Sequence, residues 1–152
     1  MKYCYSYETL IGNITIVTDN EFLVEIVFCK TIIGLEKETI LIKKVKKQID
    51  EYFNGIRREF DIPIKLNGTD FQIKVWEELA KIKYGEYISY QELAERIKNK
   101  NYARAVGMAN NRNPIPIIIP CHRVIGKNGE LIGYGGGLGI KKKLLEIEVV
   151  IK

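Results

Sequence analysis

The sequence is poor in the residues that build metal centres and disulfide frameworks. Its 152 residues include one histidine and three cysteines. A single histidine, His122, excludes a site that needs two imidazole ligands, and zinc-finger spacing is absent, so we expect no metal ion. The cysteines are odd in number and form no C-x-x-C pair, which argues against disulfides and favours a reducing, cytoplasmic setting.

Long apolar stretches and nucleotide-binding motifs are also missing. No run approaches the roughly 18 apolar residues that cross a bilayer, and Met1 to Tyr5 hold no apolar signal segment, so we expect neither a membrane anchor nor export. The glycine-rich stretch from Gly133 to Gly139 has neither the ending of a phosphate loop nor the spacing G-x-G-x-x-G. We therefore exclude a nucleotide cofactor and expect a backbone that comes close to a planar ligand.

Positive charge is present in excess and is unevenly distributed. The chain has 24 Lys and Arg against 19 Asp and Glu, and it is 46% hydrophobic, an ordinary globular composition. The whole net charge of +5 lies after residue 68. The tract from Arg96 to Gly129 holds seven cations and no Asp or Glu. This tract predicts a polyanion-binding surface, with a solvated face as an equal alternative.

The first part of the chain has the pattern of a small sheet with one helix. Alternating apolar residues predict strands over 3–7, 14–17 and 22–28. Helical spacing predicts a helix from Glu36 to Phe53, and residues 61–66 are typical of one more strand.

The second part is helical. Thr69-x-x-Gln72 and Ser89-x-x-Glu92 are capping boxes, which predict helices over about 70–82 and 90–98. A third helix is predicted from Asn101 to Asn110. Short helices joined by a tight connection beside a basic tract indicate a helix-turn-helix.

The third of these helices carries small residues and one arginine, Arg104. A helix that reads the major groove needs more polar side chains. A smooth helix with one arginine suits the minor groove, where a side chain wedges into the base stack. Close packing of the small residues against the core is the alternative reading.

Cys121 is the candidate nucleophile. The prolines between Asn113 and Pro120 predict a rigid extended segment, which is a good mount for a reactive group. A thiol needs a base or a cation nearby to ionise at neutral pH, and His122 is a base. Neighbours in an extended segment point to opposite faces, so contact between Cys121 and His122 requires a bridging water or a turn.

Three other ionisable side chains are less informative. Cys4 and Cys29 fall in strand patterns, so we expect inert core thiols. Glu148 is either solvated or orients a histidine, and spacing alone leaves both alternatives open.

Several segments together resemble the O6-alkylguanine-DNA alkyltransferase family. The most specific of them is Pro120-Cys121-His122-Arg123-Val124, and the resemblance covers residues 69–148 in conforming order and spacing. The other matching segments are Val75-Trp76, Gly85 to Tyr90, Ala103 to Gly107, and Asn110 to Pro114.

The resemblance implies an α/β (α+β) fold of two domains. Residues 1–66 would form a small ribonuclease H-like sheet-and-helix domain. Residues 69–152 would form a winged helix-turn-helix-like domain with the active-site cysteine. The implied function is DNA repair by direct reversal, in which the alkyl group of O6-alkylguanine or O4-alkylthymine in double-stranded DNA is transferred irreversibly to Cys121 after the nucleotide is flipped.

Roles for single residues follow from the same resemblance. His122 would accept the thiol proton through a water, Glu148 would hold the imidazole, and Asn113 would brace the segment. Tyr90 would help to rotate the nucleotide and would donate a proton toward guanine. The predicted DNA contacts are Arg104, which would fill the gap left by the flipped base, and Tyr90, Gln91, Tyr102, Ala103, Gly107, Arg112, Arg123 and Lys127. The predicted base pocket consists of Tyr134, Gly135, Pro116 and Asn110.

The chain departs from the family pattern at Gly135, where many members have serine, so a hydroxyl donor to O6 is missing. A thioether is stable in cells, so each molecule is expected to act once. The resemblance also implies a monomer, and we expect no cofactor.

Three other functions remain as alternatives. A non-transferring lesion-binding relative would have another residue at position 121, and Cys121 argues against it. A winged-helix transcription regulator is disfavoured by the few polar side chains on the third helix. A cysteine hydrolase is weakened by the missing oxyanion-loop signature.

Overall fold

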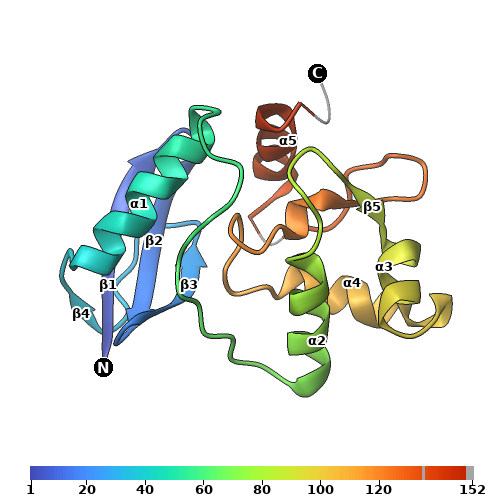
Figure 1. The fold of residues 1–152 in the computed structure, drawn as a ribbon, viewed down its shortest axis with the longest axis horizontal. Coiled ribbons are helices and arrows are strands. Elements are labelled where there is room, and N and C mark those ends of the chain that lie inside the picture. The colour runs from blue at the N-terminus through green and yellow to red at the C-terminus, as the bar shows by residue number, and fades with distance from the viewer. Residues whose placement is uncertain (135, 150–152) are drawn as a thin grey trace. The chain divides into compact units, whose positions relative to one another are not determined.

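The structure is a computed structural model that describes residues 1–134 and 136–149 (Figure 1). The chain forms two compact units, Met1–Asn67 and Gly68–Lys152. The mixed α/β architecture confirms the predicted fold class.

The first unit is a sheet of four strands with one helix. The strands are β1 (Lys2–Thr9), β2 (Gly12–Asp19), β3 (Phe22–Val27) and the short β4 (Leu35–Glu36), and the helix is α1 (Ile40–Phe53). Their order in the sheet is β3-β2-β1-β4, with β1 antiparallel to β2 and parallel to β4. Three of these strands were predicted, whereas β4 was missed because two residues give no periodic signal.

Both faces of this sheet are used. Ile14 and Ile16 of β2 are fully buried, as are Ile42 and Val45 of α1, which lies across the sheet in Figure 1. Alternate residues point the other way, and there Cys4 packs with two buried valines of the sheet. The alternation of side chains thus places buried apolar residues on both faces of the sheet.

Two boundaries in the first unit differ from prediction. The helix begins after Thr39, whose hydroxyl accepts a hydrogen bond from Ile42 N, so the predicted start at Glu36 was too early. The strand predicted over 61–66 is wrong, since only Ile64 bridges to Leu23. Pro63 has no N–H to donate, which prevents a continuous ladder there.

The second unit contains the helices and the reactive segment. Its elements in chain order are α2 (Asp70–Leu79), β5 (Ile88–Ser89), α3 (Tyr90–Ile97), η1 (Lys100–Tyr102), α4 (Ala103–Asn111), η2 (Cys121–Arg123), β6 (Val124–Ile125) and α5 (Leu138–Ile147). The three predicted helices correspond to α2, α3 and α4. None of the helices in the described ranges has the length and apolar character needed to cross a membrane.

The caps explain where these helices begin. Thr69 and Gln72 form the full predicted capping box. Ser89 accepts a hydrogen bond from Glu92 N at 3.0 Å, but the Glu92 carboxylate turns to Arg96 instead, at 2.6 Å. The second box is therefore only half formed.

Trp76 ties α2 to α4. The residue is 2% exposed, and its Nε1 donates to Ala109 O at 2.8 Å. Gly68 lies against the same ring, where an added Cβ would come within 2.6 Å of it. Glycine is therefore required where the chain enters the second unit.

The segment before Cys121 is not extended, which corrects our prediction. Ile119 N donates to Ile115 O at 2.9 Å, and Ile117 has a φ of +75°, in the left-handed region. A β-branched residue rarely adopts this conformation, so the turn is strained locally and is held by its buried surroundings. The result is a folded turn that leads into η2.

Candidate active site

Cys121 begins η2 and is buried, with 4% of its surface exposed. Asn113 stabilises the turn before it. The amide Nδ2 of Asn113 donates to Ile119 O at 2.7 Å, and its Oδ1 accepts from Ile115 N at 3.0 Å. Both ends of this side chain therefore hold the backbone that presents the thiol.

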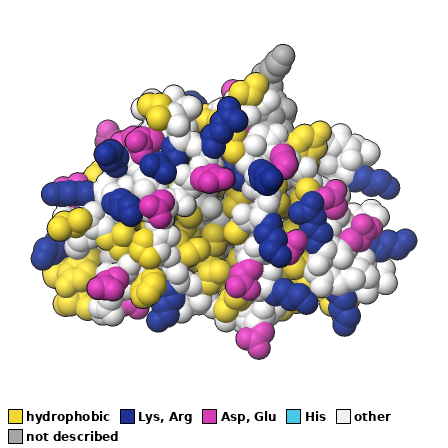
Figure 2. All heavy atoms as spheres, viewed as in Figure 1, with side chains coloured by type: hydrophobic (Ala, Val, Ile, Leu, Met, Phe, Trp, Pro, Cys, Tyr) yellow, Lys and Arg dark blue, Asp and Glu magenta, His cyan; other side chains and the backbone are white. Residues whose placement is uncertain are grey.

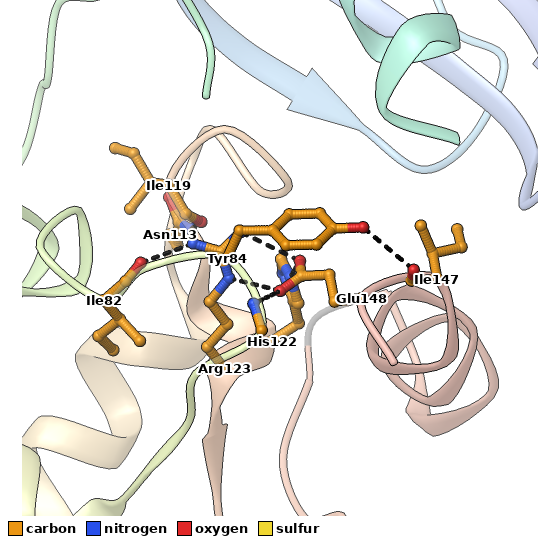
Figure 3. A network of polar contacts seen from close by, with 9 residues as sticks. Ile82, Tyr84, Asn113, Ile119, His122, Arg123, Ile147 and Glu148 are labelled. Carbon is orange, nitrogen blue, oxygen red and sulfur yellow. Dashed lines mark hydrogen bonds and ion pairs between the residues drawn. The ribbon is translucent and has the colours of Figure 1, made fainter. Parts of the chain in front are cut away.

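His122, Arg123 and Glu148 form a buried polar network (Figure 3). His122 Nε2 lies 2.6 Å from Glu148 Oε2. Arg123 donates through Nε to Glu148 Oε1 at 2.8 Å and through Nη2 to Oε2 at 3.1 Å. This arrangement decides between the alternatives for Glu148, because its carboxylate is enclosed and contacts the histidine. No cyan histidine is visible on the face that Figure 2 presents, in keeping with this burial.

The loop that follows α2 closes the network. Gly85 N donates to Glu148 Oε1 at 3.1 Å, and Arg123 Nη1 donates to Ile82 O at 2.6 Å. Tyr84 lies beneath the guanidinium, whose central carbon is 5.9 Å from the ring centroid. The carboxylate thus receives bonds from three directions and is fixed in position.

The network sets the protonation states at the site. Burial alone would raise the pKa of Glu148, but the hydrogen bond and charge of His122, together with Arg123, lower it to about 2. Burial lowers the pKa of His122, against the opposing effect of Glu148. At neutral pH the pair is therefore a carboxylate and a neutral imidazole, which is able to accept a proton.

The thiol is protonated at rest. Burial raises the pKa of Cys121 to about 11, while hydrogen bonds from Asn113 and Tyr134 and the charge of Lys141 act in the opposite direction. The thiolate therefore forms only when a base takes the proton as the thiol attacks.

Lys141 is a buried cation that the sequence analysis missed. The side chain on α5 is fully buried, and Nζ donates to Val124 O at 2.6 Å and to Ile132 O at 2.9 Å. Burial lowers its pKa to about 8, against the effect of Cys121, which raises it. In the sequence it is one of three consecutive lysines, and only the spacing of the apolar residues on α5 could have shown that it faces inward.

Tyr90 connects this region to an open pocket of about 340 Å³. Its hydroxyl donates to Ile132 O at 2.6 Å. Burial, and next the nearby Cys121, raise the pKa of Tyr90 to about 12, so the hydroxyl keeps its proton at neutral pH. The residues that line the pocket are Tyr90, Ala103, Arg104, Gly107, Asn111, Ile132 and Gly133.

The structure brings part of the predicted DNA-contact set together. Arg104, Ala103 and Gly107 come from one face of α4 and line the pocket with Tyr90. The remaining predicted contacts are partly or fully exposed, except Arg123: they are Gln91, Tyr102, Arg112 and Lys127.

The structure corrects the prediction that Arg123 contacts DNA. Its residue surface is 5% exposed, and the guanidinium is bound to Glu148 and Ile82 O. The group is used inside the protein, so it does not contact DNA as we predicted. Burial of this kind depends on Glu148, 25 residues away, and the local sequence does not reveal it.

The basic tract therefore presents less positive charge to a ligand than its composition indicates. Arg96 pairs with Glu92 at 2.6 Å, and Arg123 pairs with Glu148, so two of its seven cations are neutralised within the protein. Figure 2 shows acidic and basic side chains interspersed over the face that it presents. Apart from Arg96, the exposed cations of the tract are Lys98, Lys100, Arg104, Arg112 and Lys127.

Of the predicted pocket residues, Pro116 and Asn110 are buried and Tyr134 is partly buried, while Gly135 lies outside the described residues. The expectation for the other thiols was half right, since Cys4 is buried but Cys29 is exposed. Within residues 1–134 and 136–149, no three His, Cys, Asp or Glu side chains gather in a group able to hold a metal.

Taken together, these features define a helix-turn-helix protein with a buried cysteine next to a buried imidazole–carboxylate pair. Two family profiles then identify it more closely. Residues 70–150 match the 6-O-methylguanine DNA methyltransferase DNA binding domain, and residues 2–66 match the ribonuclease-like domain of the same proteins. The chain belongs to the 6-O-methylguanine DNA methyltransferase family, which confirms the resemblance found in the sequence.

Individual relatives agree with this assignment. The chain is 45% identical to a methylated-DNA–protein-cysteine methyltransferase of Mycobacterium leprae, over 97% of this chain and 93% of the relative. It is 43% identical to the protein of that name from Methanosarcina acetivorans, over 96% and 97% of the two chains. A crystal structure of Mycobacterium tuberculosis OGT in complex with DNA superimposes with a TM-score of 0.89 at 41% identity, over 96% of this chain and 92% of the other.

Proposed function

We propose that this protein repairs O6-alkylguanine in double-stranded DNA by transferring the alkyl group to Cys121. The observation that carries the proposal is the buried pair of His122, which follows the cysteine in η2, and Glu148, at the end of α5, with Nε2 and Oε2 2.6 Å apart. A neutral imidazole held by a carboxylate is a base suited to a thiol that is protonated at rest.

The reaction is a displacement at the alkyl carbon. The sulfur of Cys121 forms a bond to that carbon as the bond from the carbon to guanine O6 breaks. The thiol proton passes to His122 through a water and is then released to solvent, while Tyr90 supplies a proton to the departing guanine and regains one from solvent. The products are a thioether on Cys121 and an unmodified guanine, so each molecule acts once.

The protein reaches its substrate by extruding the damaged nucleotide. Arg104 is exposed on α4 at the edge of the pocket, next to the small residues Ala103 and Gly107. This placement supports insertion of the guanidinium into the stack as the base leaves it. Contacts from Gln91, Tyr102, Arg112 and Lys127 hold the DNA backbone, and Tyr134, Gly135, Pro116 and Asn110 enclose the base.

The protein acts as a monomer, without a cofactor, in the cytoplasm. One chain supplies the nucleophile, the base and the residue that orients the base, which supports a self-sufficient unit. A reducing compartment keeps the essential thiol available.

The test is the mass of the Cys121 peptide after incubation with duplex DNA that carries one O6-methylguanine. We expect that peptide alone to gain one methyl group, and the gain to stop at one per protein. Exposed Cys29 is the internal control, because non-specific alkylation would reach it first. The variant Cys121→Ser should bind the lesion and gain no methyl group. Binding by the wild type without any mass gain would replace transfer with lesion sensing.

A further inference from the structure

Tyr84 contacts the buried polar network at two points. It lies in the loop between α2 and β5, and Figure 3 shows its hydroxyl pointing toward Ile147. The hydroxyl donates to Ile147 O at 3.1 Å, and the ring centroid lies 5.9 Å from the central carbon of the Arg123 guanidinium. A cation at this distance is attracted by the face of an aromatic ring. One side chain therefore contacts both the arginine and the end of α5.

The bond to Ile147 holds the backbone of the residue that carries the carboxylate. Ile147 is the last residue of α5, and Glu148 caps the helix. The last four carbonyls of a helix have no donor within it, and the last turn of α5 contains no Lys, Arg or His that could supply one. Helix ends fray where tertiary contacts do not hold them. The hydroxyl of Tyr84 provides such a contact at the peptide bond that joins Ile147 to Glu148.

The residue after Tyr84 holds the side chain of Glu148. Gly85 N donates to Glu148 Oε1 at 3.1 Å. Gly85 has a φ of +81°, in the left-handed region that glycine adopts without strain. Tyr84 and Gly85 thus bind the backbone before Glu148 and its carboxylate, across 63 residues of chain in each case. Two adjacent attachment points fix both the position and the direction of the glutamate.

The position of Glu148 matters because of its contact with His122. Oε2 lies 2.6 Å from Nε2 and belongs to an ionised carboxylate, so Nε2 carries the hydrogen and Nδ1 is the basic nitrogen of the ring. A carboxylate that holds an imidazole in one tautomer and one orientation makes it an effective base. A shift at the end of α5 would therefore reach the group that accepts the thiol proton.

We propose that Tyr84 is a positioning residue for alkyl transfer, whose hydroxyl holds the end of α5 so that Glu148 keeps the imidazole of His122 oriented as the base. The inference rests on the proposed function and adds to it a residue of the loop that follows α2.

The first test uses the single histidine of the untagged chain, whose imidazole gives one set of NMR signals. The variant Tyr84→Phe removes only the hydroxyl. Tyr87→Phe is the matched control, because this exposed tyrosine lies in the same loop. We expect the Nε2 proton of His122 to resonate far downfield at pH 7, since it is bonded to a carboxylate. It should move upfield in Tyr84→Phe and stay in place in the control.

The second test is the rate of transfer to Cys121 at saturating protein. We expect Tyr84→Phe to slow transfer about threefold to tenfold, by the same factor on duplex DNA and on free O6-benzylguanine, because one base serves both reactions. A defect in DNA binding would slow the duplex reaction alone. A loss of stability alone would lower the active fraction without moving the imidazole signal of the folded molecules.

An unchanged imidazole signal or an unchanged rate in folded Tyr84→Phe would overturn the proposal. Absence of transfer by the wild type would instead overturn the proposed function, and the imidazole signal would then decide on Tyr84 alone. If Tyr84→Phe does not fold, hydrogen exchange of the wild type replaces it. The amide of Glu148, which donates to Leu144 O, should exchange as slowly as amides in the middle of α5, and exchange at the rate of a frayed end would refute the anchor.

Discussion

Arg123 and Glu148 form a two-point ion pair inside the protein, with Nε 2.8 Å from Oε1 and Nη2 3.1 Å from Oε2. Each oxygen that Arg123 contacts has a second partner, since Oε2 also meets His122 Nε2 and Oε1 also meets Gly85 N. The arginine therefore keeps the carboxylate ionised and fixed, and the carboxylate in turn fixes the imidazole.

Replacing Glu148 with Gln should cost about 3 kcal/mol of stability, because Arg123 is left as an uncompensated buried cation. Urea unfolding followed by the fluorescence of Trp76, the single tryptophan, measures the loss. Glu146→Gln is the control, since this exposed carboxylate lies two residues away. Equal stabilities of the two variants would contradict a structural role for the pair.

The contribution of Glu148 should depend on pH in a defined direction. Its pKa is about 2 in the folded protein, against roughly 4.3 in an unfolded chain. A lowered pKa stabilises the fold fully above the unfolded value, and this stabilisation is lost as the pH falls toward 2. The free-energy difference between wild type and Glu148→Gln should therefore shrink between about pH 4.5 and pH 2. Urea titrations at pH 7, 4 and 3 test this, and a constant difference would count against it.

Arg104→Ala should slow transfer on duplex DNA by about tenfold to a hundredfold, because the vacated stack is no longer filled. Free O6-benzylguanine needs no extrusion, so its rate should change little. Single-turnover rates at saturating protein measure both. Arg112→Ala, which also removes an exposed cation, should weaken binding without changing the saturated rate. Equal slowing of Arg104→Ala on both substrates would exclude insertion into the stack.

Lys141→Met should make the thiol of Cys121 harder to ionise, because the charge of Lys141 lowers the pKa of that thiol. Reaction of Cys121 with iodoacetamide at pH 7, where Lys141 with its pKa of about 8 is mostly charged, should slow severalfold, as the thiolate is the reactive form. The rate at exposed Cys29 serves as the internal standard. Lys142→Met, at an exposed neighbouring position, should leave the rate at Cys121 unchanged. A rate at Cys121 that is equal or higher in Lys141→Met would refute this electrostatic effect.

Features that depend on local sequence were predictable. The capping residues Thr69 and Ser89 located the starts of α2 and α3 because a cap acts within one turn of helix. Alternation of apolar residues located the three longer strands for the same reason.

Features that depend on distant contacts were not predictable. Arg123 and Lys141 look like surface cations until α5 brings Glu148 to one and the carbonyls of residues 124 and 132 surround the other. The turn before Cys121 was missed because prolines indicate extended chain, whereas the left-handed conformation of Ile117 comes from packing. Neither burial nor a strained φ is visible in local composition.

The burial of Cys121 affects how long an unused molecule of this single-turnover protein stays active. Oxidants and stray electrophiles attack thiolates that solvent can reach. Here Cys121 is 4% exposed, and burial raises the pKa of its thiol to about 11, so the unused molecule carries its one reactive atom in an unreactive form. The thiol therefore stays unreactive until it is used, and the number of lesions that can be repaired equals the number of protein molecules that are not yet alkylated.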